Sequence, residues 1–386
     1  MTEKLYEQDS HRAEFRARVT ECRSVDEGFE IVLDQTAFFP ESGGQYGDRG
    51  SLNGIPVLDT KIRNGIILHK TAEPIPAGTE VEGRLNWELR FRRMQNHSGE
   101  HIVSGLVHKK YGFDNVGFHL GDGDVTLDFN GELNREQLRE IEAEANGAVW
   151  SDIPLHIWFP DSSALERLNY RSKLELTENV RIVEIPGYDI CACCAPHVNR
   201  TGEIGMIKIL DFMRHRGGVR VHILCGRDAL EDYDSRYGNT LEISGMLSAK
   251  QRETAEAVRR KCEELAELRQ KLNEANRLVV RFKTECLPET EGNLCFIEEN
   301  LDMLTLRELV NAGMQKCTGI CGGFTGREGE WQYIIGSRTV DLRKASKEIN
   351  AAISGRGGGK PEMIQGSSAA KREQLLHYFE TAEFGA

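Results

Sequence analysis

The first part of the chain, between about residues 12 and 90, alternates apolar and polar positions. A period of two is expected of half-buried strands. Five candidate strands lie in this region, at 15–19, 29–33, 56–62, 66–69 and 81–85. Gly, Asn and Pro residues separate several of them, as they do between strands of antiparallel sheets. The pattern therefore predicts a small β-barrel or sandwich, of which we expect the barrel-like form.

Farther along the chain the pattern becomes helical. A helix is predicted from about Asn86 to Lys110, followed by a mixed α/β stretch to about Gly226. Within 240–283, apolar residues recur at spacings of three and four amid Arg, Lys and Glu: Val258, Cys262, Leu265, Leu268, Leu272, Ala275 and Val279. This spacing predicts an amphipathic helix with a coiled-coil-like seam. The helix either packs on its own protein or mediates self-association to a homodimer.

A chain of 386 residues is long for one compact domain. We predict an α+β fold in four parts: a β-rich domain at 1–90, an α/β domain at 91–225, a helical linker at 226–285 and a C-terminal α/β domain at 286–386. The C-terminal part follows Pro288 and offers a second region, besides the linker, through which a homodimer could form.

Composition is that of an ordinary globular protein, with 39% hydrophobic and 28% charged residues. No apolar run approaches the roughly 18–20 residues that cross a bilayer, and the polar N-terminus has no secretory h-region. We therefore expect a cytoplasmic protein without a membrane partner. The net charge of -12 does not indicate nucleic-acid binding. Between Val340 and Arg372, however, there are seven basic residues and only three acidic ones. This local excess of positive charge suits contact with an RNA backbone.

Two pairs of residues at a spacing of four suggest a metal site. His97 and His101 project from one face of the predicted helix, so both imidazoles can reach one ion. Cys193 and His197 repeat the spacing in a cysteine-rich segment, where Pro196 favours a turn over a helix. Three imidazoles and one thiolate suit zinc, so we predict one Zn²⁺ per chain.

Spacing alone leaves Cys191 and Cys194 as alternatives to Cys193. In a reducing compartment such a cluster of cysteines is more often a metal or reactive site than a disulfide framework. The signature of zinc proteases is excluded because Glu100 stands directly before His101 and not directly after His97. Four protein ligands would close the coordination shell, so a zinc that only braces the fold is the alternative to one that positions a substrate.

The ligand pattern resembles the editing domain of alanyl-tRNA synthetase and of the freestanding alanyl-tRNA editing proteins. That family has a His-x-x-x-His pair followed, some hundred residues later, by a Cys-x-x-x-His pair. Segment 36–48, TAFFPESGGQYGD, resembles the glycine-rich loop of the family almost position by position, and 198–205 continues its pattern. Ser98, Ala195 and Pro196 depart from the residues usual in the family, which bears on substrate selectivity more than on metal binding.

The C-terminal segment 354–366, SGRGGGKPEMIQG, is similar to the C-terminal domain of alanyl-tRNA synthetase, which also occurs attached to DHH-type phosphoesterases. We expect neither a synthetase nor a phosphoesterase. The residues before the β-rich segment are too few for an aminoacylation core, and no Asp-His-His motif occurs. The arrangement resembles the long form of the freestanding editing proteins.

This resemblance implies a zinc-dependent hydrolase that deacylates mischarged tRNA(Ala), carrying serine or glycine. It implies that Gln45 acts at the editing pocket and that Gly43 and Gly44 let backbone amides approach the substrate. Thr36 is the candidate for reading the serine hydroxyl, because a polar pocket built around that group rejects alanine. Glu100, and more weakly His119, are the acid–base candidates.

For the C-terminal part, the expected role is tRNA binding, with Arg356 and Lys360 as contacts. Lys360 is followed by Pro361, so the glycine run is not a Walker loop. Two other functions are compatible with the sequence. One is a tRNA-binding or regulatory protein with an inactive editing fold, and the other is an editing hydrolase for a different tRNA.

Overall fold

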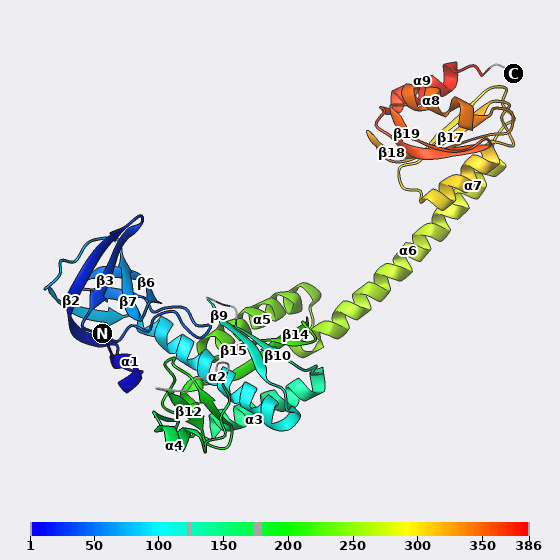
Figure 1. The fold of residues 1–386 in the computed structure, drawn as a ribbon. Coiled ribbons are helices and arrows are strands. Elements are labelled where there is room, and N and C mark those ends of the chain that lie inside the picture. Colours follow the sequence, from blue (N-terminus) through cyan, green and yellow to red (C-terminus); the bar gives the residue numbers. More distant parts are fainter. Residues whose placement is uncertain (1, 122, 124, 173–179, 385–386) are drawn as a thin grey trace. The chain divides into compact units, whose positions relative to one another are not determined.

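A computed structural model describes residues 2–121, 123, 125–172 and 180–384 (Figure 1). The chain divides into two compact units, Met1–Asn239 and Thr240–Ala386. Helices and several separate sheets occur in the described residues, which confirms the predicted combination of α and β structure. The predicted division into four domains stays a prediction.

The N-terminal region forms a closed barrel with the strand order β2-β3-β7-β6-β5-β8. Its strands are β2 (Glu14–Val25), β3 (Gly28–Leu33), β5 (Gly50–Leu52), β6 (Ile55–Arg63), β7 (Ile66–Thr71) and β8 (Glu80–Leu85). In β2, the apolar side chains of Phe15, Ala17 and Val19 are buried, and the polar residues between them are exposed. Alternation of this kind lets each strand fill the barrel with one face and meet water with the other.

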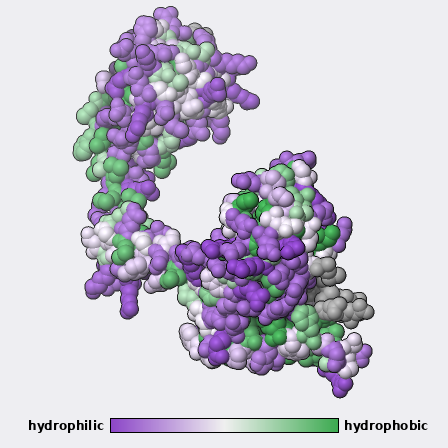
Figure 2. All heavy atoms as spheres, turned by 90° about the vertical axis from the view of Figure 1, so that its left-hand side faces the viewer, coloured by the Kyte–Doolittle hydropathy of each residue, from purple (hydrophilic) through white to green (hydrophobic). Residues whose placement is uncertain are grey.

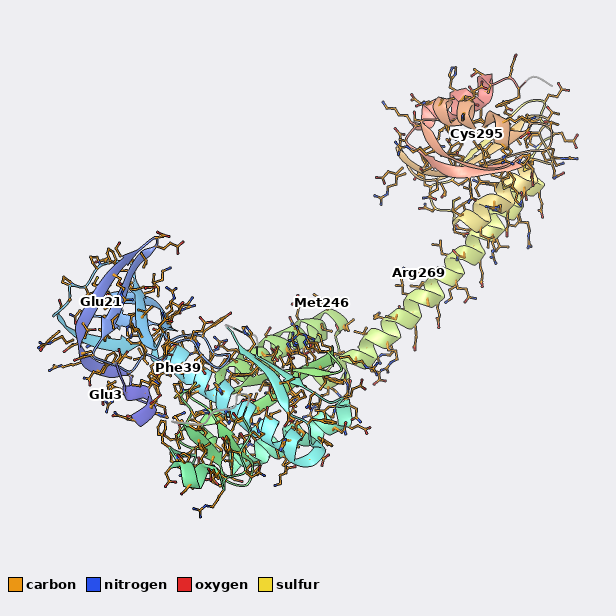
Figure 3. All side chains as sticks on the ribbon, in the orientation of Figure 1. Glu3, Glu21, Phe39, Met246, Arg269 and Cys295 are labelled. Carbon is orange, nitrogen blue, oxygen red and sulfur yellow. The ribbon has the colours of Figure 1, made fainter. Side chains whose placement is uncertain are left out.

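Strand β4 (Gln35–Thr36) pairs in parallel with β1 (Glu3–Lys4), which precedes α1 (Leu5–Gln8). The loop after β4 is held in place by a buried arginine of the helix that begins at Trp87. Arg90 forms an ion pair with Asp48 and donates hydrogen bonds to the carbonyl oxygens of Ser10 and Ala37. Asp48 also accepts a hydrogen bond of 2.7 Å from the backbone N–H of Phe39, a residue labelled in Figure 3. The glycine-rich loop is thereby held against the helix that carries the histidines.

Helix α2 (Trp87–Tyr111) confirms the helix predicted from Asn86 to Lys110. The Asn86 side chain caps its N-terminus by accepting from the backbone N–H of Leu89, and Gly112 ends it in the left-handed conformation. The helix packs against the four-stranded sheet β14-β15-β10-β9 (Figure 1). Those strands are β9 (Asn115–Leu120), β10 (Val125–Phe129), β14 (Ile207–His215) and β15 (Gly218–Cys225).

Two further groups of elements complete the part of the chain that surrounds α2. Helix α3 (Arg135–Trp150) packs on α2, and the short elements are α4 (Ser162–Leu165) and η1 (Thr201–Ile204). A three-stranded sheet contains β11 (His156–Trp158), β12 (Ile182–Ile185) and β13 (Asp189–Ala192). Because β13 contacts α2, the loop that follows β13 lies beside the histidines of that helix.

Helix α5 (Gly226–Leu247) begins within the first unit, where Asp228 forms an ion pair with Arg92 and accepts a hydrogen bond from Asn96. The chain then turns at Ser248, which has a φ of 49°. It continues through η2 (Gln251–Glu253) into α6 (Thr254–Glu285). The helical region at 240–283 is therefore two helices and not one.

In α6, every residue of the predicted seam is exposed, and side chains project around the helix near Arg269 (Figure 3). Val258, Leu265, Leu268, Leu272 and Val279 have between 44% and 55% of their surface exposed. Within the described part of this chain, the seam is not buried. Self-association of the seam stays a prediction.

The second unit also contains the five-stranded sheet β16-β17-β18-β20-β19, in which β16 runs parallel to β17 and the other neighbours are antiparallel. Its strands are β16 (Leu294–Ile297), β17 (Ile320–Arg327), β18 (Glu330–Ser337), β19 (Gly355–Lys360) and β20 (Met363–Ser368). Its helices are α7 (Met303–Gly313), α8 (Leu342–Ala352) and α9 (Arg372–Thr381). Trp331 and Tyr333 of β18 are fully buried in the core of this sheet.

Hydrophilic residues cover much of the face shown in Figure 2, with apolar residues interspersed. None of the helices in the described part of the chain has the length and apolar composition that crossing a bilayer requires.

A buried histidine in the barrel predicts how stability depends on pH. Burial lowers the pKa of His69 to about 4, although a hydrogen bond with the Ile31 carbonyl acts in the opposite direction. The unfolded chain, with a pKa near 6.5, takes up a proton at higher pH than the folded chain does. Stability from this residue is therefore complete above pH 6.5 and falls as the pH drops toward 4. Between pH 7 and 5 the expected loss is about 2 kcal/mol.

The measurement is urea denaturation at pH 7 and pH 5 of the wild-type protein and His69→Gln. Glutamine does not titrate, so the free energy of unfolding should fall less steeply with acid in the variant. The difference between the two proteins cancels all contributions that they share. If the free energy of unfolding falls equally in the wild-type protein and in His69→Gln, folding does not lower the pKa of His69.

Candidate metal centre

Four side chains converge in the first unit: His97 and His101 from α2, and Cys193 and His197 from the loop after β13. Their candidate ligand atoms all lie within 4.8 Å of one another. The three histidines are buried, and Cys193 is partly exposed. These are the four residues that the sequence predicts as metal ligands.

The donor set and its spacing fit a tetrahedral zinc ion. The Sγ atom of Cys193 lies 3.5 Å from Nε2 of His97 and 3.3 Å from Nε2 of His197. With Zn–N bonds of about 2.0–2.1 Å and Zn–S bonds of about 2.3 Å, a tetrahedral site places N and S about 3.5 Å apart. The four side chains could therefore hold such an ion with little rearrangement.

The two alternative cysteines lie elsewhere. Cys191 is buried on β13, where it groups with His101 and Asp189. Cys194 is exposed, and its Sγ atom lies 3.6 Å from Oγ of Ser42. Of the three cysteines, the one that joins the four-residue group is Cys193.

Each histidine has a separate hydrogen-bond partner at Nδ1. His97 donates to Oε1 of Gln45 at 2.8 Å, and His101 donates to Oδ2 of Asp189 at 2.9 Å. In His197 the partner is the hydroxyl of Ser98, 3.0 Å away. A proton on Nδ1 leaves the lone pair on Nε2, and such partners orient metal-binding histidines. All three rings are thus fixed with Nε2 available for the ion.

Two members of the cluster have the charge states of metal ligands, whereas His101 differs. Burial lowers the pKa of the His101 imidazole, but its hydrogen bond with Asp189, together with nearby acidic groups, outweighs burial and raises that pKa well above the ordinary value, so metal binding there would release a proton. Burial would raise the pKa of the Cys193 thiol, but the neighbouring imidazoles of His97 and His197 outweigh it, and the pKa falls well below the ordinary value. Burial lowers the pKa of His197 to about 3, so that ring is neutral near pH 7. A thiolate and a neutral imidazole are the forms that coordinate zinc.

The glycine-rich loop reaches the cluster through Gln45, which is fully buried. Gly43 and Gly44 have φ angles of 61° and 83°, so they form a tight turn that other residues adopt rarely. Ser42 and Gln45 close this turn with two backbone hydrogen bonds of 3.0–3.1 Å. The amide nitrogen of Gln45 is buried and has no partner among the described residues. It is therefore a donor available to a ligand.

Glu100 is the carboxylate beside the cluster. Its Oε2 lies 3.8 Å from Nε2 of His101, the nitrogen that faces the candidate ion. Its Oε1 accepts hydrogen bonds from Ser104 at 2.7 Å and from Asn115 at 2.6 Å. The side chain is buried and its orientation is fixed. Glu100 can act on a group bound at the cluster.

Thr36 is farther from the predicted chemistry. Its hydroxyl is fully buried, lies 2.8 Å from Nε2 of His69 and accepts from the backbone N–H of Phe38. Neither partner is one of the four candidate ligands. Arg356 and Lys360 are exposed on β19 of the second unit.

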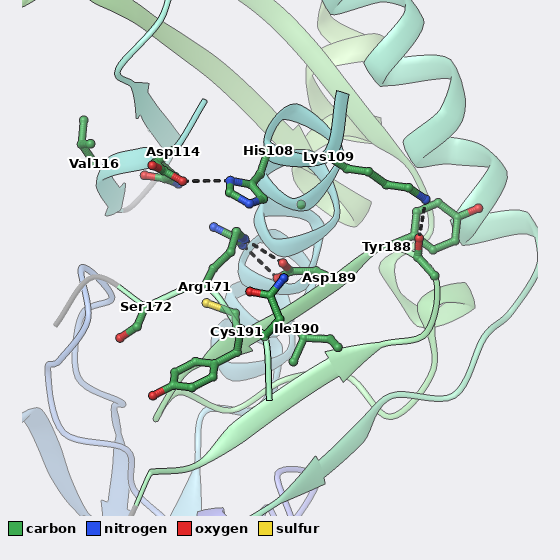
Figure 4. Close-up of a pocket in the computed structure, with 15 residues that line it drawn as sticks. His108, Lys109, Asp114, Val116, Arg171, Ser172, Tyr188, Asp189, Ile190 and Cys191 are labelled. Atoms are coloured by element: carbon green, nitrogen blue, oxygen red, sulfur yellow. Dashed lines mark hydrogen bonds and ion pairs between the residues drawn. The ribbon is translucent and has the colours of Figure 1, made fainter. Parts of the chain in front are cut away.

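A pocket of about 790 Å³ is lined in part by Asp189, the residue that accepts the hydrogen bond from Nδ1 of His101 (Figure 4). Its floor contains Asp189, which forms a two-pronged ion pair of 2.7 and 2.8 Å with Arg171. Burial opposes ionisation of Asp189, but its hydrogen bonds with His101 and Arg171 keep the pKa of the carboxyl below its ordinary value. Sequence reasoning missed both residues. The signal for Asp189 was an acid four positions before a predicted ligand.

Comparisons with known proteins agree with this architecture. Residues 5–89 match the family described as tRNA synthetases class II (A), and residues 180–221 match the Threonyl and Alanyl tRNA synthetase second additional domain. The Alanine–tRNA ligase of Methanococcus maripaludis is 29% identical over 97% of this chain, and that of Halorubrum lacusprofundi is 34% identical over 60% of it. This chain spans only 43% and 26% of those two ligases. The chain is thus similar to part of the alanine–tRNA ligases.

The Alanyl-tRNA editing protein AlaX-L of Pyrococcus horikoshii is 28% identical, and the alignment covers 97% of each chain. This match confirms the predicted resemblance to the long form of the alanyl-tRNA editing proteins. Among solved structures, the C-Ala domain of Aquifex aeolicus alanyl-tRNA synthetase matches with 20% identity, over 22% of this chain and 84% of that domain. Its TM-score is 0.19, which supports no structural argument.

Proposed function

We propose that this protein is a zinc-dependent hydrolase that removes serine or glycine from mischarged tRNA(Ala). The enzyme is an aminoacyl-tRNA hydrolase, as its similarity to an alanyl-tRNA editing protein along nearly the whole chain supports. One observation carries the proposal: Gln45 of the glycine-rich loop is bonded directly to His97 of the four-residue cluster. The loop expected to hold the substrate and the residues expected to hold the metal thus form one site.

Different residues of the chain have different roles in hydrolysis of the ester. Zinc bound by His97, His101, Cys193 and His197 would supply positive charge that polarises the ester carbonyl or orients the ribose end. The unpartnered amide N–H of Gln45 donates to the carbonyl oxygen, where negative charge develops as water attacks. Glu100 takes a proton from that water as its oxygen bonds to the carbonyl carbon. Glu100 then gives this proton to the ribose oxygen as the bond between the carbonyl carbon and that oxygen breaks, releasing the amino acid and free tRNA.

The proposal also assigns roles to other residues of this chain. Gly43 and Gly44 allow the backbone to approach the substrate, and Thr36 reads the serine hydroxyl. Residues 1–90 are the glycine-loop domain, 91–225 the zinc-binding editing domain, 226–285 a linker and 286–386 the tRNA-binding domain. Arg356 and Lys360 contact the tRNA backbone, and the α6 seam offers a homodimer interface. The site of action is the cytoplasm.

The test is a deacylation assay with Ser-tRNA(Ala), Gly-tRNA(Ala), Ala-tRNA(Ala) and a serine ester of another tRNA. Catalytic amounts of protein should release serine from tRNA(Ala) at least about a hundredfold faster than alanine, as a hydroxyl-reading site can achieve. Glycine has no hydroxyl, so its release measures what the site accepts without that group. Faster hydrolysis of the other tRNA would favour an editing enzyme of different specificity. Tight tRNA binding with no hydrolysis would favour the tRNA-binding or regulatory protein.

A further inference from the structure

A second hollow, of about 480 Å³, lies against the glycine-rich loop. Its lining includes Tyr46 and His119, whose rings are 5.6 Å apart and nearly perpendicular. Tyr46 keeps 37% of its surface exposed, so its ring is available to a ligand. Gly43 and Gly44 contribute backbone to the wall. The volume is within the range of small-molecule sites.

The hollow is connected to the metal cluster through the glycine-rich loop, because Gly44 and Tyr46 of its lining flank Gln45, which is hydrogen-bonded to His97. Of the four candidate ligands, Cys193 is the one that is only partly buried, so an ion held there would be most accessible beside it. The next residue, Cys194, contacts Ser42, which lines the hollow. The larger pocket of Figure 4 is placed differently, because Asp189 and the ring of His101 stand between it and the metal-facing Nε2. The smaller hollow is therefore better placed than the larger pocket to bind the part of the substrate next to the reacting ester.

We propose that this hollow binds the 3′-terminal adenosine of aminoacyl-tRNA, with the base stacked on Tyr46 and its edge toward the ring of His119, which stands nearly perpendicular to Tyr46. The proposal rests on the proposed function, since the ester to be cleaved is attached to the ribose of that nucleoside. Aromatic and imidazole rings are the usual platforms for unpaired bases. A side chain at Gly44 would place its Cβ 2.3 Å from the Phe118 carbonyl oxygen. Close packing of the loop on Phe118 therefore requires glycine at this position, whereas a Cβ at Gly43 would meet open space, and the bare backbone there can be approached closely.

Base stacking, more than phosphate attraction, would supply the binding free energy here. Lys61 and Arg63 line the hollow, but Lys61 pairs with Asp59 at 3.3 Å and with Glu41 at 3.9 Å. Arg63 pairs with Glu30 at 3.0 Å. These acids neutralise much of the positive charge, so a simple anion is a poor occupant. A neutral nucleoside with a π-face fits the lining better.

The experiment uses the zinc-loaded, full-length protein and tRNA(Ala) whose terminal adenine is replaced by 2-aminopurine. Stacking on an aromatic ring quenches this base, so wild-type protein should lower its fluorescence. Tyr46→Leu should abolish most of the quenching and leave the zinc content unchanged, and His119→Gln should weaken it. In deacylation of Ser-tRNA(Ala), Tyr46→Leu should raise KM on the order of tenfold with a smaller change in kcat. Tyr170→Leu, in the larger pocket, is the matched control and should behave as wild type.

Quenching that persists in both Tyr46→Leu and His119→Gln would overturn the proposal, as would quenching lost in Tyr170→Leu instead. An absence of quenching by the wild-type protein would overturn it too. The fluorescence does not depend on hydrolysis, so failure of the two proposals can be told apart. Quenching that requires Tyr46, in a protein without deacylase activity, would support this subsite and contradict the proposed reaction.

Discussion

Cys193→Ala is expected to lose most of its zinc and nearly all of its deacylase activity. Cys193 is the one thiolate of the four-residue cluster, and its Sγ lies within 3.5 Å of two metal-facing nitrogens. Loss of a residue that only supports a ligand typically costs tenfold to about a hundredfold in metal affinity or activity, so loss of a ligand should cost more. Elemental analysis of the purified protein and the rate of serine release from Ser-tRNA(Ala) measure the two effects.

The neighbouring cysteines provide matched controls. Cys194→Ala alters an exposed side chain beside the ligand and should keep its zinc. Cys191→Ala removes a buried thiol on β13 that has no place in the four-residue group, and it should also keep its zinc. Full zinc in Cys193→Ala, combined with loss in either control, would show that the wrong cysteine is assigned.

Elements with a regular period were predictable from the sequence. In β2, alternation alone located Phe15, Ala17 and Val19 on the buried face. The spacing of His97 and His101 fixed both rings on one face of α2, because helical geometry relates residues four apart. The break between α5 and α6 was missed. Its signal was weak, since it depends on Ser248 adopting a positive φ within an otherwise helical pattern.

Contacts between residues far apart in the sequence could not be predicted from local sequence patterns. Asp189 bonds His101 across 88 positions of sequence, and Ser98 bonds His197 across 99. No periodicity relates such residues, since tertiary packing brings them together. The resemblance to a family placed Gln45 at the pocket, but not its hydrogen bond to His97. The sequence therefore predicted the candidate ligands, whereas their orienting partners required the fold.

Together, these partners suggest why the site can be both closed and reactive. Gln45, Asp189 and Ser98 each occupy the Nδ1 position of one histidine, so none of them takes up space on the metal-facing side. Glu100 approaches that side, with its Oε2 atom 3.8 Å from Nε2 of His101. The amide nitrogen of Gln45 has no partner among the described residues and belongs to the side chain that meets Nδ1 of His97. Reaction with the ester then depends on residues around the ion as much as on the ion itself.

Glu100→Gln is accordingly expected to lower kcat by about a hundredfold to ten-thousandfold, the usual contribution of a general base, and to retain its zinc. Glutamine preserves the size of the side chain and an oxygen that can accept from Ser104 and Asn115, but it cannot take a proton from water. Single-turnover deacylation of Ser-tRNA(Ala) measures the chemical step, and elemental analysis measures zinc.

Ser104→Ala separates the charge of Glu100 from its orientation. It removes one of the hydrogen bonds to Oε1 and keeps the carboxyl group itself, so its kcat should fall far less than that of Glu100→Gln. A raised KM with unchanged kcat in Glu100→Gln would contradict proton transfer, because it would mean that the carboxylate binds substrate equally before and during reaction. Loss of zinc in Glu100→Gln would instead assign the carboxylate, which lies 3.8 Å from Nε2 of His101, to the metal's own support.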